Sequence, residues 1–289
     1  MSEAPDLAAF EAQRPRLLRL AYRMLGSVSE AEDVVQDAWI RWAGADQVAD
    51  PAAWLVRATS RLCVDRLRAA KVRREAYRGP WLPEPLIEDL AQDPLERADD
   101  VSVAFLLALQ RLSALERAVF LLREVFDEDY TAIAETLGRN EPAVRQLYAR
   151  AKAHVADARP RFSVSQEEAG RLAYAFMDAA SRGDYPALAA LLAKDAVMVT
   201  DGGGKRKASL RPLQGPEDIV ALLKGLAWRK AWPDAVEVKP ARINGYPGVI
   251  LVQEDGPSTL AFQPSPDGKL AGVYLVRNPD KLQVLRPLA

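Results

Sequence analysis

Residues 130–152 read YTAIAETLGRNEPAVRQLYARAK, and this stretch decides the fold of the middle of the chain. Its first nine residues predict a short helix that ends at Gly138, and a second helix is expected to begin near Glu141. Ala134 and Gly138 are small enough to let two helices pack closely. The second helix is rich in basic and amide side chains, which can reach base edges in a major groove. The stretch predicts a helix-turn-helix, with an ordinary αα-hairpin as the alternative.

More helices are expected upstream of this stretch. Ser113, with Glu116 three residues later, matches a capping box and predicts the start of the preceding helix. Apolar spacing predicts a helix over residues 10–25, with Pro15 at its start or at a kink. The sequence SEAE at residues 29–32 resembles a second capping box, and Asp50-Pro51 predicts the start of a long helix that reaches about residue 74.

Charge is balanced over the 289 residues but segregated along them. The 39 basic and 40 acidic side chains give a net charge of −1. Residues 54–78 hold eight basic and two acidic side chains (8 − 2 = +6), whereas residues 80–100 hold one basic and seven acidic ones (1 − 7 = −6). Residues 130–161 form a second basic block, with six basic and three acidic side chains. Two basic blocks around an acidic linker suggest two contacts with a polyanion, and solvated helix faces are the alternative. The four prolines of residues 79–100 exclude one regular helix there.

The pattern changes after about residue 165. Helices are expected over residues 165–183, 186–193 and 215–226, and a strand over residues 196–200. Alternating apolar runs then predict strands over residues 236–243, 248–253, 258–263 and 269–277, with glycine- and proline-containing turns between them. Helices followed by a strand meander predict an α+β domain.

Several phrases of the sequence resemble a known family. AEDVVQDAW (31–39), WLVR (54–57), CVDRLR (63–68) and LSALERAVF (112–120) are similar to regions 2 and 4 of extracytoplasmic-function (ECF) sigma factors of the sigma-70 family. WLPEP (81–85), DGGGK (201–205) and NPDKL (278–282) resemble the subgroup with a C-terminal SnoaL-like domain. The resemblance implies two all-α domains and an α+β SnoaL-like (NTF2-like) cone. The expected boundaries are residues 1–78 for region 2, 79–100 for the linker, 101–162 for region 4 and 163–289 for the SnoaL-like domain.

The resemblance also implies partners and the residues that meet them. The core RNA polymerase is expected to bind through its largest-subunit clamp and its flap, with the clamp contacting Glu32, Asp33, Gln36 and Asp37. The minus-ten promoter element is expected to meet an aromatic side chain and a set of cations, namely Trp54, Arg57, Arg61, Arg66, Arg68, Lys71, Arg73 and Arg74. The minus-thirty-five element is expected to meet Arg139, Asn140, Glu141, Arg145, Gln146 and Arg150. Pro142 departs from the residue that many relatives carry there.

The subgroup phrases suggest a regulatory contact between the linker and the last domain. Its expected residues are Trp81, Pro83, Glu84, Asp201, Gly203, Lys205, Asn278, Asp280 and Lys281. The acidic linker could instead run through the RNA path of the polymerase, and the sequence leaves both arrangements open. A tight turn is the simpler interpretation of residues 201–205.

Catalysis and metal binding are not expected. Cys63 and His154 are the chain's single cysteine and single histidine, which excludes an internal disulfide and multi-thiolate or multi-histidine metal sites. The loop at residues 202–205 lacks the first glycine and the Ser/Thr of a phosphate-binding Walker loop. No cofactor is expected, although a small-molecule ligand in the last domain stays open. Without a long apolar run or a signal peptide, we expect a cytoplasmic protein without membrane contact. A one-component, ligand-sensing repressor or activator is the alternative function, since such a regulator binds its operator without polymerase.

Overall fold

The computed structural model describes residues 7–45, 48–88, 102–155, 164–228 and 235–285. The chain forms two compact units that interleave along the sequence. The first unit combines Met1–Glu75 with Phe105–Arg159, and the second combines Ala76–Ala104 with Pro160–Ala289. The predicted linker therefore belongs to the unit of the C-terminal domain. Among the described residues, no helix is long and apolar enough to cross a membrane.

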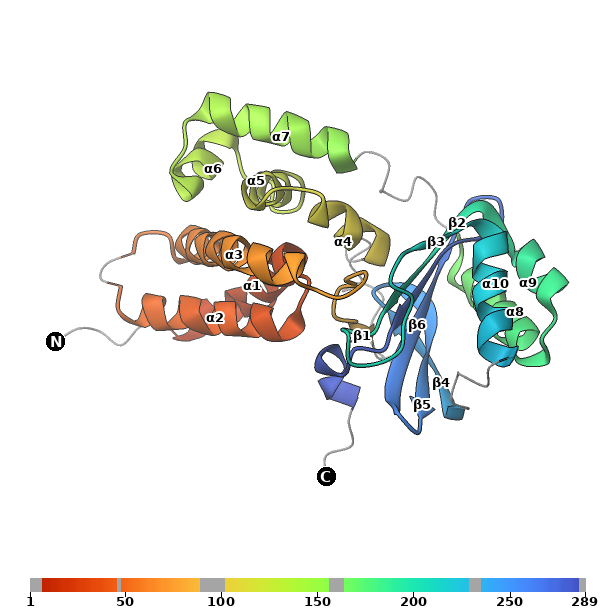
Figure 1. Cartoon of the computed structure of the whole chain (residues 1–289). Coiled ribbons are helices and arrows are strands. Elements are labelled where there is room, and N and C mark those ends of the chain that lie inside the picture. Colours follow the sequence, from red (N-terminus) through yellow and green to blue (C-terminus); the bar gives the residue numbers. More distant parts are fainter. Residues whose placement is uncertain (1–6, 46–47, 89–101, 156–163, 229–234, 286–289) are drawn as a thin grey trace. The chain divides into compact units, whose positions relative to one another are not determined.

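Three helices form the N-terminal part of the first unit (Figure 1): α1 (Leu7–Leu25), α2 (Val28–Ala43) and α3 (Pro51–Glu75). Pro15 lies inside α1 rather than at its start. The predicted N-cap of α2 at Ser29 is wrong. Gly26 has a left-handed φ of 72° that ends α1, so the chain turns earlier and Ser27 caps α2 by accepting from the amide of Glu30 at 3.2 Å.

Among the described residues, four further helices lie wholly or mainly in this unit: α4 (Val103–Gln110), α5 (Ala114–Glu124), α6 (Tyr130–Leu137) and α7 (Glu141–Val155). Ser113 and Glu116 form the predicted capping box of α5. Arg117 is buried and donates to the carbonyl oxygens of Met24 at 2.6 Å and Leu109 at 2.8 Å. Because a buried guanidinium needs such acceptors, this residue ties α5 to α1 and α4.

The second unit is a seven-stranded sheet with helices on one of its faces (Figure 1). The strand order is β1-β4-β5-β6-β7-β2-β3, and β2 and β7 run parallel while the other neighbours run antiparallel. The strands are β1 (Ile87–Glu88), β2 (Leu192–Asp201), β3 (Leu213–Gln214), β4 (Ala235–Ile243), β5 (Tyr246–Gln253), β6 (Gly256–Pro264) and β7 (Leu270–Val276). The helices are α8 (Gln166–Arg182), α9 (Tyr185–Leu191) and α10 (Gly215–Trp228), followed by the 3₁₀ turns η3 (Pro279–Lys281) and η4 (Gln283–Leu285).

Apolar side chains fill the space between the sheet and its helices. Phe176 of α8 packs on Phe262 of β6 with ring centroids 5.2 Å apart, among leucine, valine and alanine side chains of α9, α10 and the strands. The predicted fold class is confirmed at the level of its architecture: two helical parts are followed by an α+β domain. The sequence did not predict β1, in which the linker adds an edge strand to β4 and pairs Ile87 with Ile243.

Candidate nucleic-acid interface and linker clasp

The helix-turn-helix presents most of its predicted DNA-facing residues to solvent. Gly138 ends α6 with φ 61°, and the side chain of Asn140 accepts from the amide of Ala143 at 2.9 Å at the start of α7. Two local contacts hold Arg145, an ion pair with Glu141 and the face of the Tyr130 ring, whose centroid lies 4.3 Å away. The exposed members of the predicted set are Arg139, Asn140, Arg145, Gln146 and Arg150, while Glu141 is half-buried.

Arg150 has a second partner on a neighbouring helix. Its Nε lies 3.1 Å from Oε1 of Glu116, the residue that completes the capping box of α5. Burial would raise the pKa of Glu116, but the hydrogen bonds from Ser113 and the charge of Arg150 hold that pKa below its usual value. The carboxylate therefore stays ionised at neutral pH and keeps Arg150 beside α5.

On α2, the predicted polymerase-binding residues lie along one side. Glu32, Asp33 and Gln36 are exposed, and Asp37 is partly covered. Arg66 of α3 lies 3.1 Å from Asp37 and 3.6 Å from Asp33, so it reduces the negative charge at that end of the surface. Glu32 and Gln36 are therefore more available than Asp33 and Asp37 for contact with another protein.

Trp54 lies partly in the core and partly at the surface. It is half-buried, and its ring packs on the buried Trp42 of α2 with centroids 5.5 Å apart at 58°. One part of the ring contributes to the core. The remainder is solvent-accessible, as an aromatic platform for a base must be.

The basic residues of α3 do not all point to solvent. Arg57 lies 3.8 Å from Glu135, and Arg61 donates to the carbonyl oxygens of Thr136 at 2.6 Å and Glu135 at 2.9 Å. Arg68 pairs with Asp65 at 3.6 Å. Thus two predicted minus-ten residues contact α6 of the helix-turn-helix in this conformation. The side chains of Lys71, Arg73 and Arg74 lie outside the described part of the structure.

In the second unit, a buried carboxylate holds the linker against the C-terminal domain. Asp201, at the end of β2, accepts from the hydroxyl of Tyr77 at 2.6 Å, the amide of Leu82 at 2.8 Å and the amide of Gly203 at 2.9 Å. Lys281 lies 2.7 Å from the same carboxylate. We call Tyr77, Leu82, Asp201, Asn278 and Lys281 the linker clasp.

Lys281 contacts the linker as well as Asp201. Its ammonium group also donates to the carbonyl oxygen of Leu82 and lies 3.9 Å from the centroid of the Trp81 ring. Asn278 donates to the hydroxyl oxygen of Tyr77 at 2.8 Å. Burial and the hydrogen bond to Asp201 raise the pKa of Tyr77, so this hydroxyl keeps its proton and remains a donor.

Gly203 permits the close approach of the NPDKL segment. Its φ is 62°, and a Cβ atom at this position would lie 2.4 Å from the side chain of Asn278. Next to it, Lys205 lies 2.7 Å from both carboxylate oxygens of Asp280. Pro83 and Glu84 are buried and Trp81 is half-buried. All nine predicted interdomain residues thus lie within the second unit.

A cluster of two arginines and one aspartate fixes the loop that follows β2. Arg206 and Arg277 both pair with Asp255 of the β5–β6 turn, Arg277 at 2.6 Å. Burial would raise the pKa of Asp255, but the hydrogen bond from Arg206 and the charges of both arginines hold that pKa below its usual value. The loop is therefore anchored to the sheet by charge as well as by the clasp.

The sequence did not single out Tyr77 or Leu82 as clasp members. Tyr77 lies in the basic block and Leu82 contributes through its backbone, so neither carries a local signal. Trp81 and the closely spaced prolines at positions 80, 83 and 85 were the available indication that this segment packs on a partner.

Comparison with known proteins agrees with this architecture. Residues 9–74 match the family model of sigma-70 region 2, and residues 102–155 match that of sigma-70 region 4. ECF RNA polymerase sigma factor SigJ of Mycobacterium tuberculosis is 37% identical, and the alignment covers 96% of this chain and 93% of SigJ. Probable ECF RNA polymerase sigma factor SigI of the same species is 36% identical over 98% of this chain and 96% of SigI.

A solved structure extends the similarity to the third domain. The crystal structure of the M. tuberculosis ECF sigma factor SigJ has a TM-score of 0.78 at 33% identity, over 98% of this chain and all of that one. The matched sequence and fold therefore include the linker and the C-terminal domain. The chain belongs to the extracytoplasmic-function family of RNA polymerase sigma factors, and its function is promoter recognition in transcription initiation.

Proposed function

We propose that this sigma factor reads two promoter elements with its two helical parts, and that the C-terminal domain modulates its activity by holding the linker. The observation that carries the proposal is the linker clasp, in which Asp201 and Lys281 bind the segment just after α3. The clasp holds the start of the connection between region 2 and region 4 on the C-terminal domain, so opening the clasp would lengthen the free chain between the two regions.

The α7 helix is proposed to read the minus-thirty-five element in duplex form. Arg145 and Gln146 are exposed side chains on adjacent positions, and their donors match purine edges in the major groove. Arg139 and Arg150 lie at the two ends of the same surface and suit the phosphate backbone. Asn140 and Glu141 complete the proposed set at the start of the helix.

The minus-ten element is proposed to bind along α3 after a rearrangement. Trp54 offers an aromatic surface for an unstacked base, and Arg66 and Arg68 offer cations for the backbone. Arg57 and Arg61 join this set only after their contacts with Glu135 and Thr136 break, because one guanidinium cannot satisfy α6 and DNA at once. Lys71, Arg73 and Arg74 extend the proposed set.

Core RNA polymerase is the proposed partner. The exposed acids of α2 suit a basic surface on the largest-subunit clamp, where complementary charge favours the encounter and the register. Glu32, Asp33, Gln36 and Asp37 form this surface, and region 4 is proposed to meet the flap. This partner would place the protein in the cytoplasm. We assign no catalytic role to any residue.

Run-off transcription with purified core polymerase on the gene's own upstream region tests the proposal. Arg145→Ala should reduce the transcript about tenfold, the effect of losing one base contact worth about 1–3 kcal/mol. Arg171→Ala is a matched control, since Arg171 pairs with Glu167 four residues before it on α8 as Arg145 pairs with Glu141 on α7. The control should stay within about twofold of the unmodified chain.

The same assay tests modulation through the clasp. Tyr77→Phe removes one hydrogen bond to Asp201 and keeps the ring, so the fold is retained while the hold on the linker weakens. We expect the amount of transcript to change. Equal transcription by the two proteins over a range of polymerase concentrations would argue against modulation by the clasp. Tight binding to the upstream region without core polymerase, with no transcript, would instead favour a one-component regulator.

A further inference from the structure

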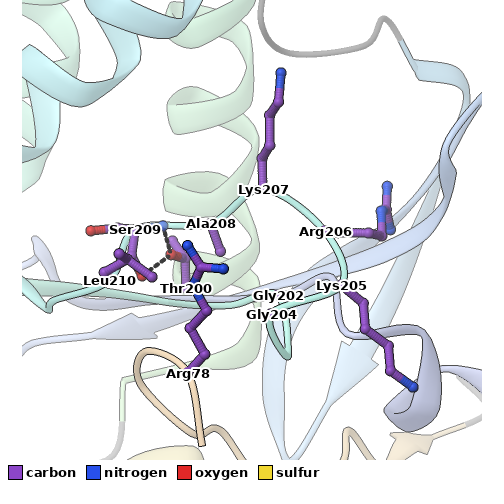
Figure 2. A pocket seen from close by; sticks show the side chains of 10 residues that line it. All are labelled: Arg78, Thr200, Gly202, Gly204, Lys205, Arg206, Lys207, Ala208, Ser209 and Leu210. Carbon is purple, nitrogen blue, oxygen red and sulfur yellow. Dashed lines mark hydrogen bonds between the residues drawn. The ribbon is translucent and has the colours of Figure 1, made fainter.

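A pocket of about 340 Å³ lies where the linker meets the loop after β2 (Figure 2). Its wall includes Arg78 of the segment between α3 and the linker, Thr200 of β2 and the loop residues Gly204, Lys207 and Leu210. All of them belong to the second unit. The pocket lies outside the apolar core between sheet and helices, and its volume is in the range that small-molecule sites occupy.

The lining of the pocket carries an excess of positive charge. Among the described residues that line it, four are basic and none is acidic. Lys205 and Arg206 are neutralised by Asp280 and Asp255. Arg78 and Lys207 are exposed, and neither pairs with a carboxylate within the described ranges. Within the part of the chain that the structure describes, the pocket thus offers two cations without a carboxylate partner, from two different segments.

Close backbone packing fixes the position of Arg78. A Cβ atom on Gly204, whose φ is 71°, would lie 3.3 Å from Cβ and 3.5 Å from Cδ of Arg78, so the stem of the arginine lies across this glycine. The neighbouring Gly79 approaches the loop as closely, with 3.6 Å from its Cβ position to the carbonyl oxygen of Ser209. In Figure 2 the guanidinium of Arg78 extends toward Thr200 and Ser209, while Lys207 extends outward from the loop.

We propose that this pocket binds a small phosphate monoester, with Arg78 as its principal ligand and Lys207 as a second cation at the rim. The guanidinium presents forked donors that match two phosphate oxygens, and two cations suit the double charge of the group. Leu210 is 64% exposed and provides an apolar surface for the organic part of the molecule. The hydroxyls of Thr200 and Ser209 already donate to backbone carbonyls, so they are not counted as donors to the ligand.

Binding at this place would also strengthen the attachment of the linker. Arg78 comes from the segment that leads from α3 into the linker, whereas the remaining lining comes from the C-terminal domain. A ligand that contacts both favours the docked state by mass action. This inference concerns binding alone and stands whether or not the linker clasp modulates transcription.

The test is a calorimetric titration of the full chain with inorganic phosphate and, separately, with AMP, at constant ionic strength. We expect saturable binding of both, tighter for AMP because its ring adds contact with Leu210. Arg78→Gln should weaken binding at least tenfold and Lys207→Gln about threefold. Arg171→Gln, on the exposed side of α8, is the matched control and should bind as the unmodified chain does.

A second readout follows the linker itself. Hydrogen exchange at residues 77–82 should slow on addition of AMP in the unmodified chain and stay unchanged in Arg78→Gln. Equal affinity of Arg78→Gln and the unmodified chain, or absence of saturation, would overturn the proposal. It would also be overturned if neither small anion bound while Arg78→Gln weakened binding of a short DNA duplex, because the pocket would then contact DNA backbone. Unfolding curves recorded without ligand verify that each variant is folded.

Discussion

Arg61 of α3 caps the C-terminal end of α6. Its Nε and Nη2 donate to the carbonyl oxygens of Thr136 at 2.6 Å and Glu135 at 2.9 Å. The last carbonyls of a helix lack partners within the helix, and the helix dipole favours a cation there. A residue predicted to bind promoter DNA therefore holds the first helix of the helix-turn-helix in this conformation.

Arg61→Ala should loosen the packing of α3 on α6. We expect the free energy of unfolding of the first unit to fall by about 1–2 kcal/mol, the contribution of charge-assisted hydrogen bonds at a partly exposed site. Chemical denaturation measures this change, and hydrogen exchange should accelerate at α6. Arg68→Ala is the control on the same helix, because Arg68 pairs only locally with Asp65 among the described residues. If both variants exchange alike at α6, the contact contributes nothing to the packing.

Lys281→Met should destabilise the second unit strongly. The variant leaves the carboxylate of Asp201 fully buried without its cation, which costs about 3–5 kcal/mol. Thermal or urea unfolding measures the loss. The double variant Asp201→Asn/Lys281→Met removes both charges and should recover part of the stability. No recovery in the double variant would mean that the hydrogen bonds of Asp201, rather than its charge, dominate.

Gly203→Ala and Gly225→Ala should change stability in opposite directions. At Gly203 the new Cβ overlaps the side chain of Asn278 and the backbone is left-handed, so we expect a loss of about 2–4 kcal/mol. Gly225 lies inside α10, and among the described residues nothing beyond its chain neighbours and the helix's own backbone lies within 4 Å of its Cβ position. Alanine there should therefore raise the free energy of unfolding by about 0.5–1 kcal/mol. Urea unfolding measures the change in the free energy of unfolding for each variant. A stabilised Gly203→Ala or a destabilised Gly225→Ala would contradict the prediction.

Asp255 should make the second unit sensitive to acid. The hydrogen bond from Arg206 and the charges of Arg277 and Arg206 hold its pKa in the folded protein below that in the unfolded chain, so its contribution to stability is complete above the unfolded-state pKa and is lost as the pH falls through the folded-state pKa. Thermal unfolding at pH 6 and pH 3 measures this. The difference in melting temperature between the unmodified chain and Asp255→Asn should be smaller at pH 3. An equal difference at both pH values would contradict the assignment.

Local signals predicted most of the fold. Gly138, Ser113 and Asp50 mark helix ends through contacts within a few residues, and the structure has helices ending or beginning at these positions. Ser29 was the wrong cap because Ser27 offers the same chemistry two residues earlier, after the left-handed Gly26. Capping patterns that overlap within one turn cannot be separated without the backbone conformation.

Long-range partners could not be predicted from the sequence. The strand β1 has two residues, and it exists because β4, more than 150 positions later, supplies the hydrogen-bond partners. Likewise, nothing near Asp201 in sequence indicates that it accepts from Tyr77 and Leu82. The motif phrases pointed to the correct segments, but only the fold decided that the linker lies on the C-terminal domain. The roles of these residues in DNA and polymerase binding stay predictions.

The addition of β1 to the sheet has a consequence for protein engineering. A chimaera that exchanges the C-terminal domain at the end of region 4 would leave residues 76–88 facing a foreign sheet edge and without the carboxylate of Asp201. The exchangeable part of this protein is discontinuous in sequence, because the segment before region 4 and the domain after it fold as one body. Grafting both pieces together, with region 4 left between them, is the design that respects the fold.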